Sequence, residues 1–243
     1  MPLPDAVDSA LGVSKPDPPP IQGVRSVASV SPVGYVAPVS WYAEHIFARV
    51  MEWMLAAPEV VAERRRTLAP IAGEVLEIGF GTGLNLPHYP AAVARLTAVD
   101  AEDMLPARVR ERIAASPIPV RRLRLDATRR LPFPDRSFDA AVTTLTLCSL
   151  ADPPAALAEL RRVIKPGGRY VFLEHGRSAD PRVARSQDRL TPLQRILACG
   201  CRLNRPVDRL ISDAGFTLVT LERFALSGAP RAFAEMYRGA AAP

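Results

Sequence analysis

Short apolar runs separated by amphipathic segments dominate the chain after residue 70. Runs rich in Val, Leu, Ile and aromatic residues predict strands over residues 73–79, 95–100, 119–126, 138–150, 167–176, 216–226 and 231–240. Apolar residues at helical spacing lie between most of these runs, at 101–116, 152–168, 185–200 and 205–215. Strands that alternate with helices form parallel β-α-β units. Because the last two strands follow one another closely, the pattern predicts an α/β fold, a doubly wound sheet with an antiparallel last strand.

The segment before the sheet divides into two parts. Residues 1–38 are rich in Pro, Ser, Val and Asp, so we expect a flexible or loosely draped arm. From Trp41 onward, helical spacing predicts an amphipathic helix that ends near Pro58, and a second helix begins there. Residues 39–243 then form one domain, with residues 41–69 packed on its core or closed over a cofactor as a lid. Trp41, Tyr42 and His45 are the lid residues expected to contact substrate.

Composition limits the class of protein. The chain has 243 residues, of which 48% are hydrophobic and 23% charged, enough for the core of one α/β domain. No apolar run approaches the ~20 residues of a membrane span, and the first thirty residues do not form a signal peptide. We therefore expect a cytoplasmic protein without stable membrane insertion. The sequence carries no signal for an oligomeric state.

The formal net charge of +6 comes from scattered arginines. The clusters at residues 64–66 and 121–124 lack the aromatic interleaving of a single-strand binder, and we interpret them as solvated faces of helices and strand ends. The expected partner is a small-molecule substrate, not a nucleic acid.

Three cysteines, Cys148, Cys199 and Cys201, are too few and odd in number for a disulfide framework. The Cys199-Gly-Cys201 motif has no second cysteine pair, and all three histidines lie far from it in the sequence. We therefore expect no metal site.

A glycine-rich turn follows the first predicted strand, in the stretch EVLEIGFGTG. Gly79 permits a tight turn, Gly81 lets the backbone approach a ligand, and Gly83 relieves crowding where a helix begins. Backbone N–H groups would then face the ligand. A purely structural turn between strand and helix is the alternative.

Glu77 bears on which ligand this loop holds. The third glycine comes one residue earlier than in the dinucleotide pattern G-x-G-x-x-G. A carboxylate directly before the loop repels a pyrophosphate but suits a ligand with an ammonium and a sulfonium group. S-adenosylmethionine is such a ligand, and a nicotinamide cofactor is the alternative.

Acidic residues end the next two predicted strands. Asp100, followed by Ala101, lies about twenty residues past the glycines, where its carboxylate can accept hydrogen bonds from ribose hydroxyls or cap the next helix. Asp126 can accept from the adenine amine, and the backbone N–H beside it, with Ala127, can donate to the adenine ring. These two acids make the nucleoside interpretation more specific than the loop alone.

Over about residues 64–238 the chain resembles class I S-adenosylmethionine-dependent methyltransferases. The features that carry the resemblance are the glycine loop, Asp100, Asp126 and the segments FPDRSFD and LRRVIKPGG. The resemblance implies a Rossmann-like, mostly parallel seven-stranded sheet with helices on both faces, and places Thr144 beside the cofactor. Phe80 departs from the Cys or Ser usual in the family and narrows the adjoining pocket.

Three segments, TLTLCSL, PGGRYVFLEH and GCRLNRPVDRLISDAGF, are similar to those of alkyl-thiol S-methyltransferases and their bacterial relatives. This similarity implies methyl transfer to the sulfur of a small hydrophobic thiol. Those enzymes begin with an apolar membrane anchor, whereas this chain begins with a Pro-rich arm.

Candidate residues for the chemistry follow the later strands. His175 is the expected general base for a thiol or hydroxyl, with a structural histidine as the alternative. Cys148 is a buried hydrophobe or a substrate contact, and Arg205 holds an anionic group, lowers a thiol pKa or begins a helix. The alternative functions are an N-, O- or C-methyltransferase for a natural-product intermediate, quinone or phospholipid head group, and a cofactor-binding module without catalysis.

Overall fold

A computed structural model describes residues 48–243. The predicted arm over residues 1–38 lies outside these residues, as do Trp41, Tyr42 and His45.

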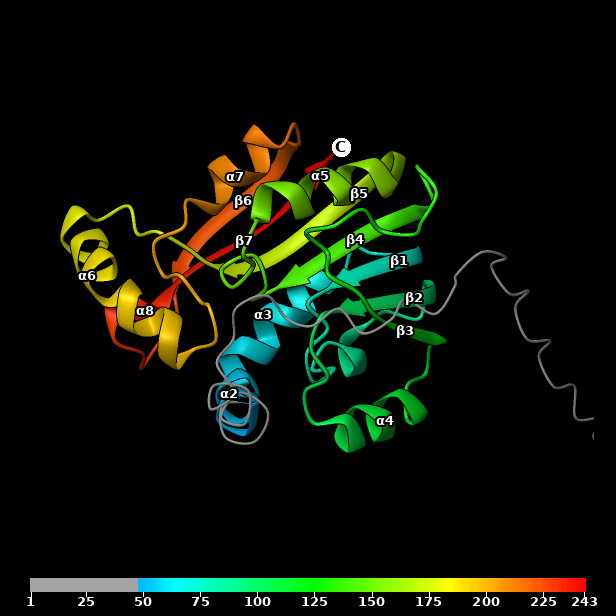
Figure 1. Cartoon of the computed structure of the whole chain (residues 1–243), viewed down its shortest axis with the longest axis horizontal. Coiled ribbons are helices and arrows are strands. Elements are labelled where there is room, and N and C mark those ends of the chain that lie inside the picture. The colour runs from blue at the N-terminus through cyan, green and yellow to red at the C-terminus, as the bar shows by residue number, and fades with distance from the viewer. Residues whose placement is uncertain (1–47) are drawn as a thin grey trace, which may run out of the picture. The chain divides into compact units, whose positions relative to one another are not determined.

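One seven-stranded sheet forms the centre of the domain, in the order β3-β2-β1-β4-β5-β7-β6 (Figure 1). The strands are β1 (Gly73–Ile78), β2 (Val93–Asp100), β3 (Val120–Arg124), β4 (Phe138–Thr144), β5 (Ile164–His175), β6 (Thr217–Ala225) and β7 (Glu235–Ala242). The pairs from β3 through β5 are parallel, whereas β7 runs antiparallel to both β5 and β6. The predicted mostly parallel sheet with an antiparallel last strand is confirmed.

The helices surround this sheet. They are α2 (Ala48–Leu55), α3 (Pro58–Leu68), α4 (Pro106–Ala114), α5 (Pro153–Val163), α6 (Pro181–Leu197), α7 (Val207–Asp213) and α8 (Arg231–Ala234), with a 3-10 turn η2 at Leu86–His88. Four of them begin with proline, whose fixed φ suits the first helical turn and whose missing N–H has no partner there in any case. The carboxylates of Asp152 and Asp180 cap α5 and α6 by accepting backbone N–H groups.

Each face of the sheet has its own apolar core. On β1, Leu76 and Ile78 point into a core shared with α5 and α7, while Val75 points into the opposite core with α3 and α4. Figure 1 shows these helix pairs on opposite sides of the sheet. Burial on both faces explains why the parallel strands are almost continuously apolar.

Two strands have a boundary that differs by four or more residues from the predicted one. The run at residues 138–150 leaves the sheet after Thr144, because Leu145 takes a left-handed conformation with φ 55°. The run at 231–240 divides into α8 and β7. The turn after Thr144 directs residues 145–150 across the carboxyl ends of the strands.

Two helix predictions also need correction. No α-helix follows the glycine loop: the chain forms only the 3-10 turn η2, which has Pro87 within it and Pro90 just beyond. In α2 the buried residues are Ala48 and Glu52, whereas the side chain of Trp53 is 80% exposed. The apolar residues expected to pack α2 on the core therefore face outward in part.

Candidate functional site

The glycine loop connects β1 to η2 at the carboxyl edge of the sheet. Gly79, Gly81 and Gly83 all have positive φ, at 75°, 56° and 80°. Thr146, from the turn after β4, occupies the space beside Gly79, where a Cβ would lie 2.0 Å from its Oγ1. Glycine at position 79 is therefore required both by its conformation and by its neighbour.

A buried hydrogen-bond network lies at the base of this loop. Glu77 accepts from Asn85 Nδ2 at 2.8 Å and from the Tyr89 hydroxyl at 2.6 Å, and Asn85 also donates to Thr144 Oγ1 at 3.0 Å. The Glu77 side chain is almost completely buried, and this burial raises its pKa to about 7, although the two hydrogen bonds oppose the shift. In the described structure, Glu77 thus uses both carboxylate oxygens to hold side chains beneath the loop.

Arg64 joins this network from α3. Its guanidinium donates to Asn85 Oδ1 at 2.6 Å, and burial lowers its pKa to about 10 even though Glu77 favours the charged form. Its Nε is buried and has no hydrogen-bond partner among the described residues. A buried cation with an unused donor beside a buried carboxylate fits a ligand with an amino-acid end, which carries one carboxylate and one ammonium. Interpreting residues 64–66 as solvated was wrong for Arg64.

Asp100 ends β2 next to the glycine loop. Its Oδ2 accepts from the Gly81 N–H at 2.7 Å and its Oδ1 accepts from the Glu102 N–H at 2.9 Å, so the carboxylate holds the two loops together. Burial raises the pKa of Asp100 while these backbone donors oppose the change. Asp100 does not cap α4, because the residue at that cap is Leu105.

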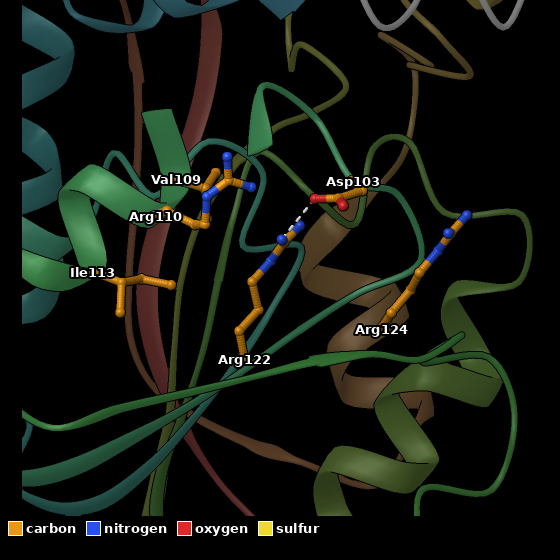
Figure 2. A pocket seen from close by; sticks show the side chains of 6 residues that line it. All are labelled: Asp103, Val109, Arg110, Ile113, Arg122 and Arg124. Atoms are coloured by element: carbon orange, nitrogen blue, oxygen red, sulfur yellow. Dashed lines mark hydrogen bonds and ion pairs between the residues drawn. The ribbon is translucent and has the colours of Figure 1, made fainter. Parts of the chain in front are cut away.

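The segment after Asp100 is fixed by arginines of β3. Arg122 pairs with Asp103 at 2.6 Å, and Arg124 donates to the Ala101 carbonyl at 3.0 Å. Arg122 and Asp103 line a pocket of about 330 Å³ that α4 borders through Val109, Arg110 and Ile113. Figure 2 shows the Arg122 side chain directed at Asp103. These contacts hold Ala101 in place beside Asp100.

Asp126 and Ala127 follow β3. Asp126 Oδ1 accepts from the Thr128 N–H at 2.9 Å and from its hydroxyl at 2.7 Å, and its side chain is half exposed. Ala127 is buried in the core. The structure thus places the glycine loop, Asp100 and Asp126 after the three consecutive parallel strands β1, β2 and β3.

Glu52 links α2 to the glycine loop, a role that the sequence analysis missed. This buried carboxylate forms ion pairs with Arg108 and Arg112 of α4, and Arg112 donates to the Thr82 carbonyl at 2.6 Å. The signal available in the sequence was an acid on the otherwise apolar face of a predicted helix. The contact joins the predicted lid segment to the cofactor loop.

Glu174 organises the turn that follows β4. The side chain is fully buried at the end of β5 and accepts from the backbone N–H groups of Thr146 at 3.1 Å and Cys148 at 3.4 Å. Burial raises its pKa, and these donors oppose the shift. No role for Glu174 was predicted from the sequence.

Arg205 also holds this turn. Its buried guanidinium donates to the Leu147 carbonyl and, at 2.5 Å, to the Leu150 carbonyl. These contacts assign Arg205 to positioning the turn. Asn204 beside it donates to Asp188.

Cys148, His175 and Cys201 meet at this place. One side-chain N or S atom from each lies within 4.8 Å of the others. Both cysteines are buried and His175 is half-buried, and the neighbouring Cys201 thiol together with burial raises the pKa of the Cys148 thiol. The expectation of no metal site assumed that the histidines lie far from the cysteines, and in space this assumption is wrong for His175.

Comparison with known proteins adds family information to this geometry. A family described as Methyltransferase domain matches residues 76–172. Phosphatidylethanolamine N-methyltransferase from Cereibacter sphaeroides is 36% identical over 64% of this chain and 77% of its own length. Demethylmenaquinone methyltransferase from Clavibacter sepedonicus is 40% identical over 51% of this chain and 50% of its own length. Thiol S-methyltransferase TMT1B from Rattus norvegicus is 32% identical over 61% of this chain and 62% of its own length.

Solved structures share the fold at lower identity. A Burkholderia thailandensis 1,6-didemethyltoxoflavin-N1-methyltransferase superposes with a TM-score of 0.58 at 18% identity, covering 88% of this chain and 92% of that one. Within residues 48–243, no helix is both long and apolar enough to cross a membrane.

Proposed function

Because the chain belongs to the class I S-adenosylmethionine-dependent methyltransferases, we propose that it methylates the sulfur of a small hydrophobic thiol. The protein is an enzyme that uses S-adenosylmethionine as methyl donor. When bound, this cofactor supplies an electrophilic methyl group on a sulfonium, which a thiolate sulfur displaces in line.

The cofactor would be held by groups from four strand ends. The glycine loop would approach it without a Cβ at Gly79, Gly81 and Gly83, whose N–H groups donate within the protein and not to a ligand as expected. Asp100 and Ala101 would hold the ribose, and Asp126 and Ala127 would hold the adenine. Arg64 would bind the amino-acid carboxylate through its unused Nε, while Glu77 and Thr144 would lie beneath the ammonium. The fit rests on the unpaired Arg64 donor, which suits the carboxylate of the cofactor, and on the buried Glu77 side chain, which suits its ammonium.

The convergence of three segments carries the thiol proposal. Cys148, His175 and Cys201 lie in the segments that resemble alkyl-thiol S-methyltransferases, and they meet beside the turn after β4. Thr146 of that turn touches Gly79, so the cluster and the cofactor loop share one edge of the sheet. In this proposal His175 accepts the thiol proton, and the buried contacts of Glu174 and Arg205 keep the surrounding turn in place.

Methyl transfer to a panel of acceptors tests the proposal. Labelled cofactor is incubated with alkyl and aryl thiols and with matched amines and hydroxyls. We expect the label to appear on thiols. His175→Ala should lower the turnover number at least tenfold. His88 lies on η2, and the control His88→Ala should keep the native turnover number. Label on amines or hydroxyls with none on thiols would overturn the thiol assignment.

A phospholipid head group is the second candidate acceptor, favoured by exposed apolar side chains. Trp53 on α2 is 80% exposed, and on α6 Leu193 is 56% and Ile196 67% exposed. Such residues together with a net charge of +6 suit an anionic lipid surface. If the acceptor is a lipid, the protein should sediment with anionic vesicles and should methylate an amine head group, and Trp53→Ser should no longer sediment. Thiol methylation without vesicle binding or head-group methylation would exclude a lipid acceptor.

A further inference from the structure

We propose that Cys148, His175 and Cys201 bind a zinc ion and leave one coordination position open for the sulfur of the substrate. The inference deepens the proposed function and rests on it for the identity of the fourth ligand. Two cysteines and one histidine with an open position form a donor set typical of catalytic zinc.

The spacing of the donor atoms fits one metal ion. All three lie within 4.8 Å of one another, whereas ligands of a tetrahedral zinc ion are separated by about 3.5–3.8 Å, given Zn–S bonds of about 2.3 Å and Zn–N bonds of about 2.0 Å. Small side-chain rotations therefore suffice to close the site. Within residues 48–243, no fourth His, Cys, Asp or Glu belongs to this group.

Backbone contacts already hold the three donors in place. The Arg202 N–H donates to the Cys148 carbonyl at 2.9 Å, which ties the segment of Cys201 to the turn of Cys148. His175 is the last residue of β5 and pairs with Met236 of β7. The buried carboxylate of Glu174 fixes the Cys148 N–H from below. A site built on fixed elements and supported by surrounding hydrogen bonds has the precision that metal ligation requires.

Charge also favours a divalent cation here. Two metal-bound thiolates would carry two negative charges next to the buried Glu174, and the guanidinium of Arg205 interacts with both sulfurs. One zinc ion would neutralise the two thiolates. Cys199, although it belongs to the C-x-C motif, lies outside the group.

The open position would activate the substrate. A thiol that coordinates zinc loses its proton to solvent, so in the zinc-bound enzyme His175 would be a ligand. The general-base role proposed above for His175 would then apply only to the metal-free protein. The metal-bound sulfur then forms a bond to the methyl carbon, the bond from the methyl group to the sulfonium breaks, and its electron pair remains on the cofactor sulfur. The thioether and S-adenosylhomocysteine leave, and zinc undergoes no redox change.

Metal binding is measured without reference to turnover. Full-length protein stripped with a chelator is titrated with Co²⁺, and zinc in the untreated protein is counted by mass spectrometry. We expect one metal per chain and a thiolate-to-cobalt charge-transfer band with the visible spectrum of tetrahedral cobalt. Cys148→Ser and Cys201→Ser should weaken this band and lower metal affinity at least tenfold, and His175→Ala should lower affinity to a similar extent.

Cys199→Ser is the matched control and should retain both the metal and the spectrum. Binding of S-adenosylhomocysteine, measured by calorimetry, shows that each variant is folded. The inference is overturned if all four variants bind cobalt alike, or if the native protein carries a Cys148–Cys201 disulfide and no metal.

A second titration separates the inference from the proposed function. An alkyl thiol added to the cobalt protein should change the charge-transfer band as a third sulfur binds. Metal binding without thiol methylation would refute the thiol function and leave the metal site standing. Equal thiol methylation by metal-free protein would refute the role of the metal and leave the function standing.

Discussion

A Cβ on Gly79 would lie 2.0 Å from Thr146 Oγ1, so the glycine loop and the turn after β4 are in direct contact. The first loop is expected to hold the cofactor and the second carries Cys148. Their contact means that a side chain at position 79 would disturb both parts of the site.

Substitution at Gly79 should therefore destabilise the protein more than its φ alone predicts. Gly167→Ala is the control, because Gly167 has φ 79° and no atom within 4 Å of an added Cβ. A left-handed alanine costs about 1–2 kcal/mol, and overpacking adds about 1–3 kcal/mol at Gly79 only. Urea unfolding should show this difference between Gly79→Ala and Gly167→Ala, and equal losses would refute the contact.

Glu77 should make the stability of the fold depend on pH. Burial raises its pKa from 4.5 to about 7, so between these values the folded chain keeps a proton that the unfolded chain releases. The free energy of unfolding should then fall as pH rises, by up to about 1.4 kcal/mol per pH unit and about 3 kcal/mol in all. Glu77→Gln should remove this dependence in urea unfolding between pH 5 and 8.

Asp188→Asn is the control for this pH series. Arg177 and Asn204 lower the pKa of Asp188 to about 2, so its carboxylate is ionised in both states from pH 5 to 8. The slope of stability with pH should be unchanged in Asp188→Asn. An unchanged slope in Glu77→Gln would show that Glu77 is not the titrating group.

The two strand-end acids should differ in their effect on cofactor affinity. Asp100 is expected to accept two ribose hydroxyls, and charge-assisted bonds contribute about 1.5–3 kcal/mol each, so Asp100→Ala should weaken S-adenosylhomocysteine binding by roughly 100-fold or more. Asp126→Ala should weaken this binding roughly tenfold, because it removes one hydrogen bond to adenine. Calorimetry measures both, with Asp103→Asn as the control for lost charge in the same loop. Equal affinities in all three variants would contradict the assignment.

The stability of the fold should depend on the planar guanidinium group of Arg205, and a positive charge alone should not replace it. Its guanidinium reaches the Leu147 and Leu150 carbonyls together, which a lysine ammonium cannot reproduce. Arg205→Lys should lose about 1–3 kcal/mol of stability, since a buried carbonyl is left unpaired. Arg202→Lys, which keeps its backbone bond to Cys148, should stay within about 0.5 kcal/mol of the native protein in urea unfolding.

Local signals were sufficient to predict most of the fold. Each of these signals determines structure within fewer than about ten residues. They are the alternation of apolar strands and amphipathic segments, Pro58 at the start of α3 and the glycines after Ile78. The strand end at Thr144 was missed, because apolar residues continue past it and only the conformation of Leu145 ends the strand.

The remainder of the site depends on contacts between distant residues. Arg64 is indistinguishable in the sequence from Arg65 and Arg66, and its burial follows from the partner Asn85 on another element. Cys148 and Cys201 have no spacing typical of a metal site, because β4, β5 and the segment after α6 bring them to His175 only in the folded sheet. Patterns along one helix or strand carry no such information.

The position of β7 sets the order in which this molecule can be completed during synthesis. β7 follows every other strand in the sequence, yet it inserts between β5 and β6, so the edge of β5 has no partner until β7 leaves the ribosome. An open strand edge is a site of wrong pairing with other chains. His175 lies on that edge, so its backbone gains its partner Met236 only as β7 folds.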